Sequence, residues 1–177
     1  SYTAPGGITF NSSYITGGGN FIVTGPATLL SDTDVTTSGG LIRFTSTIDG
    51  GYILDLDATA GGNIELQGVI GGTPLSQLIA ATSGAGEIQI SNNITTTGQQ
   101  DYTGDIVLTG SAILSTTDSL ITLGTGVTGT VGTENLTLST GTADIDLTTT
   151  PIDDIDALVL NSSGTKTLGG LIGGVTP

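Results

Sequence analysis

The sequence predicts an all-β protein built as a parallel β-solenoid, in which the chain winds in stacked coils. Three observations carry this prediction. Short stretches place apolar residues two positions apart, clusters of Gly and Asn separate these stretches, and the stretches recur in the same order at a spacing of roughly 80 residues. An antiparallel β-sandwich would use the same residue types and is the alternative, although it needs no long repeat.

The predicted strands carry apolar residues on one parity and polar residues on the other. Arg43, Asp55 and Glu65 fall on the polar parity, where side chains face solvent. The pattern is typical of strands with one buried face. In chain order the apolar pairs are Ile8 and Phe10, Phe21 and Val23, Ile42 and Phe44, Leu54 and Leu56, Ile64 and Leu66, Ile88 and Ile90, Ile106 and Leu108, Ile121 and Leu123, Leu136 and Leu138, Ile145 and Leu147, and Leu158 and Leu160.

Gly and Asn mark the predicted corners, because both residues accept the left-handed backbone angles that sharp turns require. Examples are the segments 17–20, 38–40, 61–63 and 91–93. No segment gives a convincing helix. Residues 74–81 come nearest by propensity, but their counterpart at 152–160 ends in a strand-like run, so we interpret both as a loop that enters a strand.

The long repeat suggests one domain, residues 1–177, built of two units of roughly 80 residues at about 20–93 and 94–170. Strand spacing within each unit indicates coils of roughly 20 to 30 residues with at least two strands per turn, and about seven to nine coils in all. The echoed segments are 24–31 with 109–116, 54–66 with 136–147, and 78–84 with 158–164.

Composition excludes several classes of function. Sixteen acidic residues against two basic ones, Arg43 and Lys166, give a formal charge of −14, which disfavours binding to nucleic acid or to anionic membrane surfaces. The chain contains no Cys, so it forms no disulfide, and no apolar stretch is long enough to insert in a membrane. The core is expected to be aliphatic, because Trp and Met are absent.

Catalysis is not expected, because the chain has no His and no Cys to build the usual nucleophile and base pairs. A polysaccharide-degrading β-helix enzyme would have to draw its general acid and base from Asp153, Asp154 and Asp156, the one tight acidic cluster. The same three carboxylates are the candidates for a calcium ion, the only cofactor considered. A solvated acidic face is the preferred explanation for them.

Residues 94–117 carry a family resemblance. The run Ile94-Thr-Thr-Thr-Gly-Gln-Gln-Asp-Tyr-Thr-Gly-Asp-Ile-Val-Leu-Thr-Gly110 and the strand-like segment after it resemble the repeats of filamentous-haemagglutinin-type bacterial exoproteins, and residues 62–78 are similar to another recurrent piece of those arrays. The resemblance implies a right-handed parallel β-helix that is secreted to the cell surface and serves as a stalk, adhesin or filament. No segment matches the motif of the secretion domain of such proteins.

The expected function is therefore that of a non-catalytic extracellular structural protein, a segment or subunit of a surface filament, stalk or adhesin. The alternative is an adhesive module that binds carbohydrate or cells, with host or environmental glycans as partners. Because solenoid ends expose strand edges, we expect contact with further repeats or with other copies stacked end to end. The residues expected at that contact are Leu168, Leu171, Ile172 and Val175.

Overall fold

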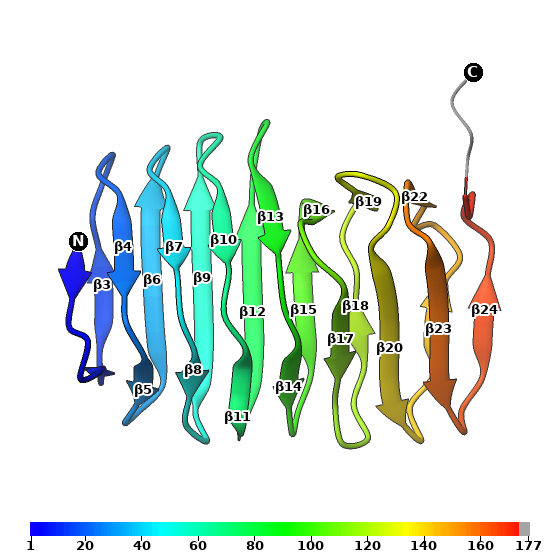
Figure 1. The fold of residues 1–177 in the computed structure, drawn as a ribbon, viewed down its shortest axis with the longest axis horizontal. Helices are drawn as coiled ribbons and strands as arrows, with labels where there is room; N and C mark the ends of the chain where they lie inside the picture. Colours follow the sequence, from blue (N-terminus) through cyan, green and yellow to red (C-terminus); the bar gives the residue numbers. More distant parts are fainter. Residues whose placement is uncertain (174–177) are drawn as a thin grey trace.

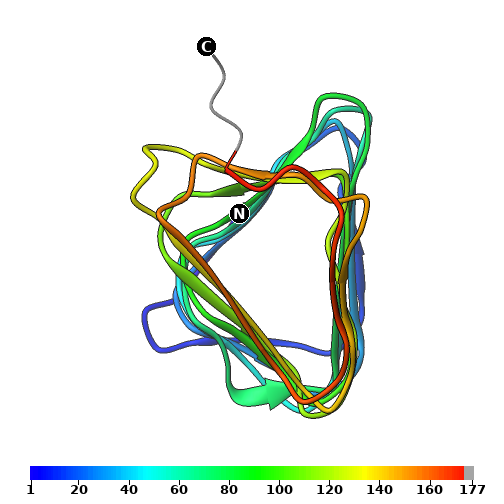
Figure 2. The same ribbon diagram turned by 90° about the vertical axis from the view of Figure 1, so that its right-hand side faces the viewer.

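The computed structural model describes residues 1–173, and this span contains strands and turns but no helix. The strands stack in eight coils along the long axis of the molecule (Figure 1). Figure 2 looks along that axis and shows a roughly triangular outline, so that each coil contributes one strand to each of three faces.

We number the faces in the order in which the chain meets them. The first face contains β1 (Tyr2–Thr3), β4 (Phe21–Thr24), β7 (Ile42–Phe44), β10 (Ile64–Leu66), β13 (Glu87–Ile90), β16 (Asp105–Leu108), β19 (Gly126–Gly129) and β22 (Ile152–Asp153). The second face contains β2 (Ile8–Phe10), β5 (Ala27–Leu29), β8 (Ile48–Asp49), β11 (Ile70–Leu75), β14 (Ile94–Thr96), β17 (Ala112–Ser115), β20 (Asn135–Gly141) and β23 (Ala157–Ser162). The third face contains β3 (Ser13–Ile15), β6 (Thr33–Ser38), β9 (Ile53–Thr59), β12 (Gln77–Thr82), β15 (Gln100–Thr103) and β18 (Ile121–Thr122), followed by β21 (Ile145–Leu147) and β24 (Lys166–Leu168).

Every strand pairing among the described residues is parallel, so the parallel β-solenoid is confirmed and the antiparallel β-sandwich is wrong. Residues in register on successive coils lie from 18 positions apart, as for Ile88 and Ile106, to 25 apart, as for Val127 and Ile152. The segments at 74–81 and 152–160 do enter strands, β12 and β23.

The core consists of rows of aliphatic side chains that point inward at the same position of each coil. One row on the first face joins Phe21, Ile42, Ile64, Ile88, Ile106, Val127 and Ile152, all of them buried. Each coil thus covers the apolar side chains of its neighbours. Burial of such a side chain contributes about 1.5–3 kcal/mol, so the stack is stabilised mainly along its axis.

Segments that resemble each other at the spacing of roughly 80 residues do not always lie on the same face. Ala27 and Ala112, from the first echoed pair, both lie on the second face. Leu54 lies on the third face, however, whereas its counterpart Leu136 lies on the second. The unit that stacks is the single coil, and the division into two long repeats stays a prediction.

Side chains at the corners tie each coil to the next. At seven corners an Asp or Asn side-chain oxygen accepts a hydrogen bond of 2.7–3.0 Å from a backbone N–H of the following coil. Asp32, Asp49, Asp118 and Asp144 are among them, so these carboxylates have a structural task. The acceptor and donor pairs are Asn20 and Leu41, Asp32 and Ile53, Asp49 and Thr73, Asn63 and Glu87, Asn93 and Ile113, Asp118 and Thr142, and Asp144 and Thr165.

A column of glycines forms the corner between the third and first faces. A Cβ atom on Gly62 would lie 2.4 Å from the carbonyl oxygen of Gly40, and one on Gly40 would lie 2.2 Å from that of Gly19. Backbone therefore packs directly on backbone at this corner. The clustering of Gly between predicted strands has this close approach as one physical cause.

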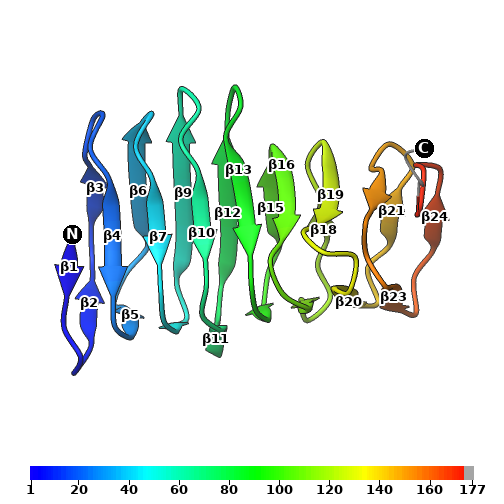
Figure 3. The same ribbon diagram turned by 45° about the horizontal axis from the view of Figure 1, so that its top comes forward.

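The third face is interrupted between the sixth and seventh coils. β18 pairs only with β15, and β21 pairs only with β24, whereas the first and second faces continue without a break. Figure 3 shows the wider separation of β18 and β21. This break cannot be predicted from the sequence, because the apolar pairs Ile121 with Leu123 and Ile145 with Leu147 alternate normally on both sides of it.

Candidate functional site at the ends of the solenoid

The acidic cluster at residues 153–156 is spread over a turn. The Asp154 backbone adopts a positive φ of 50°, and its N–H donates a 2.9 Å hydrogen bond to the Asp153 carboxylate. The Asp156 N–H donates to the backbone carbonyl of Glu134. No group of three or more acidic side chains in residues 1–173 is placed to hold a metal ion, so geometry adds no support to the calcium hypothesis.

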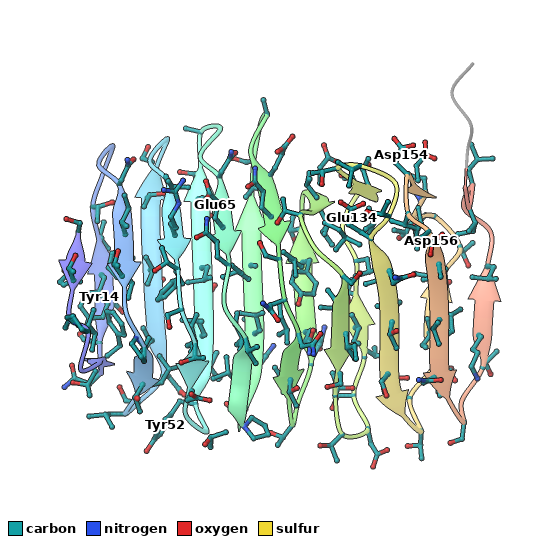
Figure 4. The ribbon with its side chains drawn as sticks, viewed as in Figure 1. Tyr14, Tyr52, Glu65, Glu134, Asp154 and Asp156 are labelled. Atoms are coloured by element: carbon teal, nitrogen blue, oxygen red, sulfur yellow. The ribbon has the colours of Figure 1, made fainter. Side chains whose placement is uncertain are left out.

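Glu134 is a buried carboxylate that sequence reasoning did not single out. It lies in the loop between β19 and β20, near Asp154 and Asp156 in the view of Figure 4. Its oxygens accept hydrogen bonds from the Thr130 hydroxyl and from the backbone N–H groups of Val131 and Thr133. The Thr130 bond first, and then the backbone bonds, lower the pKa of Glu134 to about 2. The carboxylate therefore closes the loop that contains it.

Gln100 and Tyr102, which belong to the segment that carries the family resemblance, lie inside the core. The Tyr102 hydroxyl donates a 2.9 Å hydrogen bond to Gln100 Oε1, and Gln100 Nε2 donates to the carbonyl of Ser115 at 2.8 Å. Burial raises the pKa of the Tyr102 hydroxyl far above its ordinary value. This pair bridges two faces from within, which is a structural role, and it offers no polar group to a ligand.

The amino-terminal end of the solenoid is filled by aromatic side chains. Five of the seven aromatic residues of the chain gather in the first three coils, with neighbouring ring centroids 5.3–6.4 Å apart. The rings pack edge-to-face or tilted, and such pairs stabilise the first coil. The five residues are Tyr2, Phe10, Tyr14, Phe21 and Phe44.

The carboxy-terminal end is aliphatic and less covered. The contact residues predicted from sequence are exposed there: Leu168 is 55% exposed, Leu171 77% and Ile172 42%. Val175 lies outside the described residues. Ile172 forms a single parallel bridge to Ile152, so a ninth coil begins on the first face.

Lys166 occupies an inward position of the last coil. It stands in register with Ile145, which is a buried core residue, and its ammonium donates hydrogen bonds to the backbone carbonyls of Ser162 and Gly164. An inward charge on an edge strand opposes pairing with further strands. Sequence reasoning noted Lys166 only as one of two cations.

Shallow hollows open on the sides of the solenoid. One, of about 290 Å³, lies at the interruption of the third face and is lined by Leu120, Ile121, Leu123, Asp144 and Asp146 among others. Two more, of about 280 and 320 Å³, lie over the second face and over the corner between the third and first faces. In the described part of the chain, no buried side-chain nitrogen or oxygen lacks a hydrogen-bond partner, so no buried polar group is left to be satisfied by a ligand.

No protein-family model, curated protein or solved structure matches this chain significantly. A helix long and apolar enough to cross a membrane does not occur in residues 1–173. The fold and its surfaces define the class: a regular parallel β-solenoid with an aromatic first coil and an incompletely covered last coil.

Proposed function

We propose that this chain is a non-catalytic structural segment of an extracellular filament, stalk or adhesin. The observation that carries the proposal is the continuity of the core: inward rows run from the first coil to the last on two faces without interruption. Such a stack resists bending and extension because each coil is bonded to both neighbours.

The absence of catalysis is part of the proposal, and it is supported by how the polar groups are used. The Asp and Asn side chains at the corners bind backbone N–H groups, Glu134 closes its own loop, and Gln100 with Tyr102 bridges the core. Each of these groups has a protein partner and a structural task. Asp144 and Asp146 both line the hollow of about 290 Å³, and each already accepts a hydrogen bond from a backbone N–H, of Thr165 and of Thr148 respectively.

The extracellular location and the right-handed winding rest on the resemblance to filamentous-haemagglutinin-type exoproteins. The stalk role is consistent with the strongly acidic composition, since a net charge of −14 keeps neighbouring rods apart.

Immunogold labelling of intact source cells tests this function. An antibody raised against the purified chain should label projections outside the cell envelope, and protease added to intact cells should remove the label. Labelling confined to the cell interior, or release of reducing sugar from polysaccharide by the purified chain, would overturn the proposal.

A further inference from the structure

We propose that the interruption of the third face is a docking site for an extended peptide segment of another protein, which adds as a strand along β18 and carries a Lys or Arg that binds Asp144 and Asp146. Such a partner goes beyond the structural role, and its failure to bind would leave that role intact. The interruption lies inside the solenoid, with stacked coils described on both sides of it (Figure 3).

Two strand edges face the interruption without pairing with each other. In β18 the Leu120 carbonyl accepts a hydrogen bond from the previous coil, and successive residues of a strand direct their polar groups to opposite edges, so the N–H and C=O of Ile121 point into the interruption. In β21 the Ile145 N–H donates to the following coil, so the N–H and C=O of Asp146 point back towards β18. An extended peptide supplies the regular donors and acceptors that such edges bind.

The hollow of about 290 Å³ at the interruption is lined by residues of both edges. Two of them, Ile121 and Leu123, are each 6% exposed, which is more than any other apolar residue of the buried core in the described part of the chain. Leu120, which also lines the hollow, is 50% exposed. The core is therefore least covered where the sheet is interrupted, and an added strand with apolar side chains on one face would cover it.

Asp144 and Asp146 select a basic partner, because they give the hollow a negative charge. Each accepts its hydrogen bonds on Oδ1, from Thr165 and from Thr148 respectively, which leaves Oδ2 available. The Thr148 hydroxyl first, and then its backbone N–H, lower the pKa of Asp146, so this carboxylate is ionised at neutral pH. No basic side chain in residues 1–173 forms an ion pair with either carboxylate, so a Lys or Arg of the partner would meet two charges that the chain itself does not neutralise.

Fluorescence anisotropy with a labelled probe peptide, Thr-Val-Lys-Val-Thr with blocked ends, tests the charge. When extended, the probe presents both Val side chains on one face and Lys on the other. The full chain should bind it, and a probe with Glu in place of Lys should not bind. The double variant Asp144→Asn, Asp146→Asn keeps the oxygens that hold the local hydrogen bonds and should bind about fivefold to tenfold more weakly, as expected for the loss of two exposed ion pairs. The control Asp34→Asn, Asp57→Asn removes the same charge from the uninterrupted part of the third face and should bind as the unmodified chain does.

Hydrogen–deuterium exchange of the full chain tests the location. The bound probe should slow exchange of the amides of Ile121, Leu123 and Asp146, and it should leave unchanged those of β9 and β12, which pair on both sides. Circular dichroism checks that the variants are folded. No binding of the probe at millimolar concentration, equal weakening in the two double variants, or no slowing at the interruption would overturn the peptide site. Slow exchange there without the probe would also overturn it, because the chain itself or a second copy would then fill the interruption. Surface labelling remains the separate test of the structural function.

Discussion

The pair formed by Gln100 and Tyr102 places an amide and a phenol hydroxyl inside a largely aliphatic part of the core. Removing the hydroxyl with Tyr102→Phe leaves Gln100 Oε1 buried without its donor. Loss of a buried partner costs about 1–3 kcal/mol, so we expect the free energy of unfolding to fall by that amount in chemical denaturation. Tyr52→Phe removes a hydroxyl from a side chain that is 41% exposed and should change little. Equal effects of the two variants would contradict the role of the pair.

Glu134 makes the stability of its loop depend on pH. Hydrogen bonds to the carboxylate lower its pKa from 4.5 to about 2, so the stabilisation is complete above pH 4.5 and is lost as pH falls through about 2. The thermal midpoint of Glu134→Gln should therefore lie below that of the unmodified chain at pH 6, and the difference should shrink towards pH 2. Val131→Ala alters the same loop at an exposed apolar side chain and should show a difference independent of pH. A constant difference for Glu134→Gln would refute this account.

The pKa of Asp55 shifts in the opposite direction to that of Glu134. Burial first, and then the charges of Asp34 and Asp57, raise its pKa, so the folded state loses stability as pH rises through that pKa. Asp55→Asn should stabilise the chain by about 0.2–1 kcal/mol at pH 7, and the gain should vanish in acid. Asp101→Asn is the matched control, since Ile79 and Thr122 are its neighbours in register. If Asp101→Asn stabilised the chain as much as Asp55→Asn, the gain would come from the lower net charge and not from relief of repulsion by Asp34 and Asp57.

At the scale of elements, the glycine column determines how closely the coils pack at one corner. Gly62→Ala places a Cβ 2.4 Å from the Gly40 carbonyl oxygen, so either backbone must shift. Overpacking of this kind costs about 1–3 kcal/mol, which would lower the midpoint of chemical denaturation. Gly51→Ala provides the control because nothing lies within 4 Å of its added Cβ. If both variants unfold at the same denaturant concentration, the column has no role in stability.

Sequence alone predicted strands where apolar residues alternate, and it missed strands whose inward residues are polar. In β6 the buried side chains are Thr33, Val35 and Thr37, so the apolar alternation disappears although the geometry is the same. The strand β15 was missed for the same reason, since its first inward residue is the polar Gln100. The role of the carboxylates at the corners was not predicted, because the backbone N–H groups that they bind lie 21 to 24 residues ahead and no local pattern indicates them.

The two ends of the solenoid were only partly predictable. The apolar tail from Leu168 to Ile172 was visible in the sequence, and these side chains are exposed in the structure. The row of inward side chains that runs along the second face from Ile8 to Leu160 was not visible, because the coils vary from 18 to 25 residues and the register between distant coils appears only once the strands are paired. Because the coil length varies, the regular rows of the core are not visible as a fixed period in the sequence.

At the scale of the whole molecule, residues 1–173 form eight stacked coils whose two ends differ. The first coil is aromatic and has no charged side chain, and the last complete coil is aliphatic, with Lys166 in register with the buried Ile145. The carboxylates on the sides of the rod oppose side-by-side association, which suits the proposed role in a stalk or filament.

Electron cryomicroscopy of the purified chain tests the central claim, that the chain is a structural solenoid whose rows of inward side chains run along its axis. The account predicts rods one solenoid wide with a spacing of about 4.8 Å between strands along the axis. Compact particles without that axial spacing would contradict it.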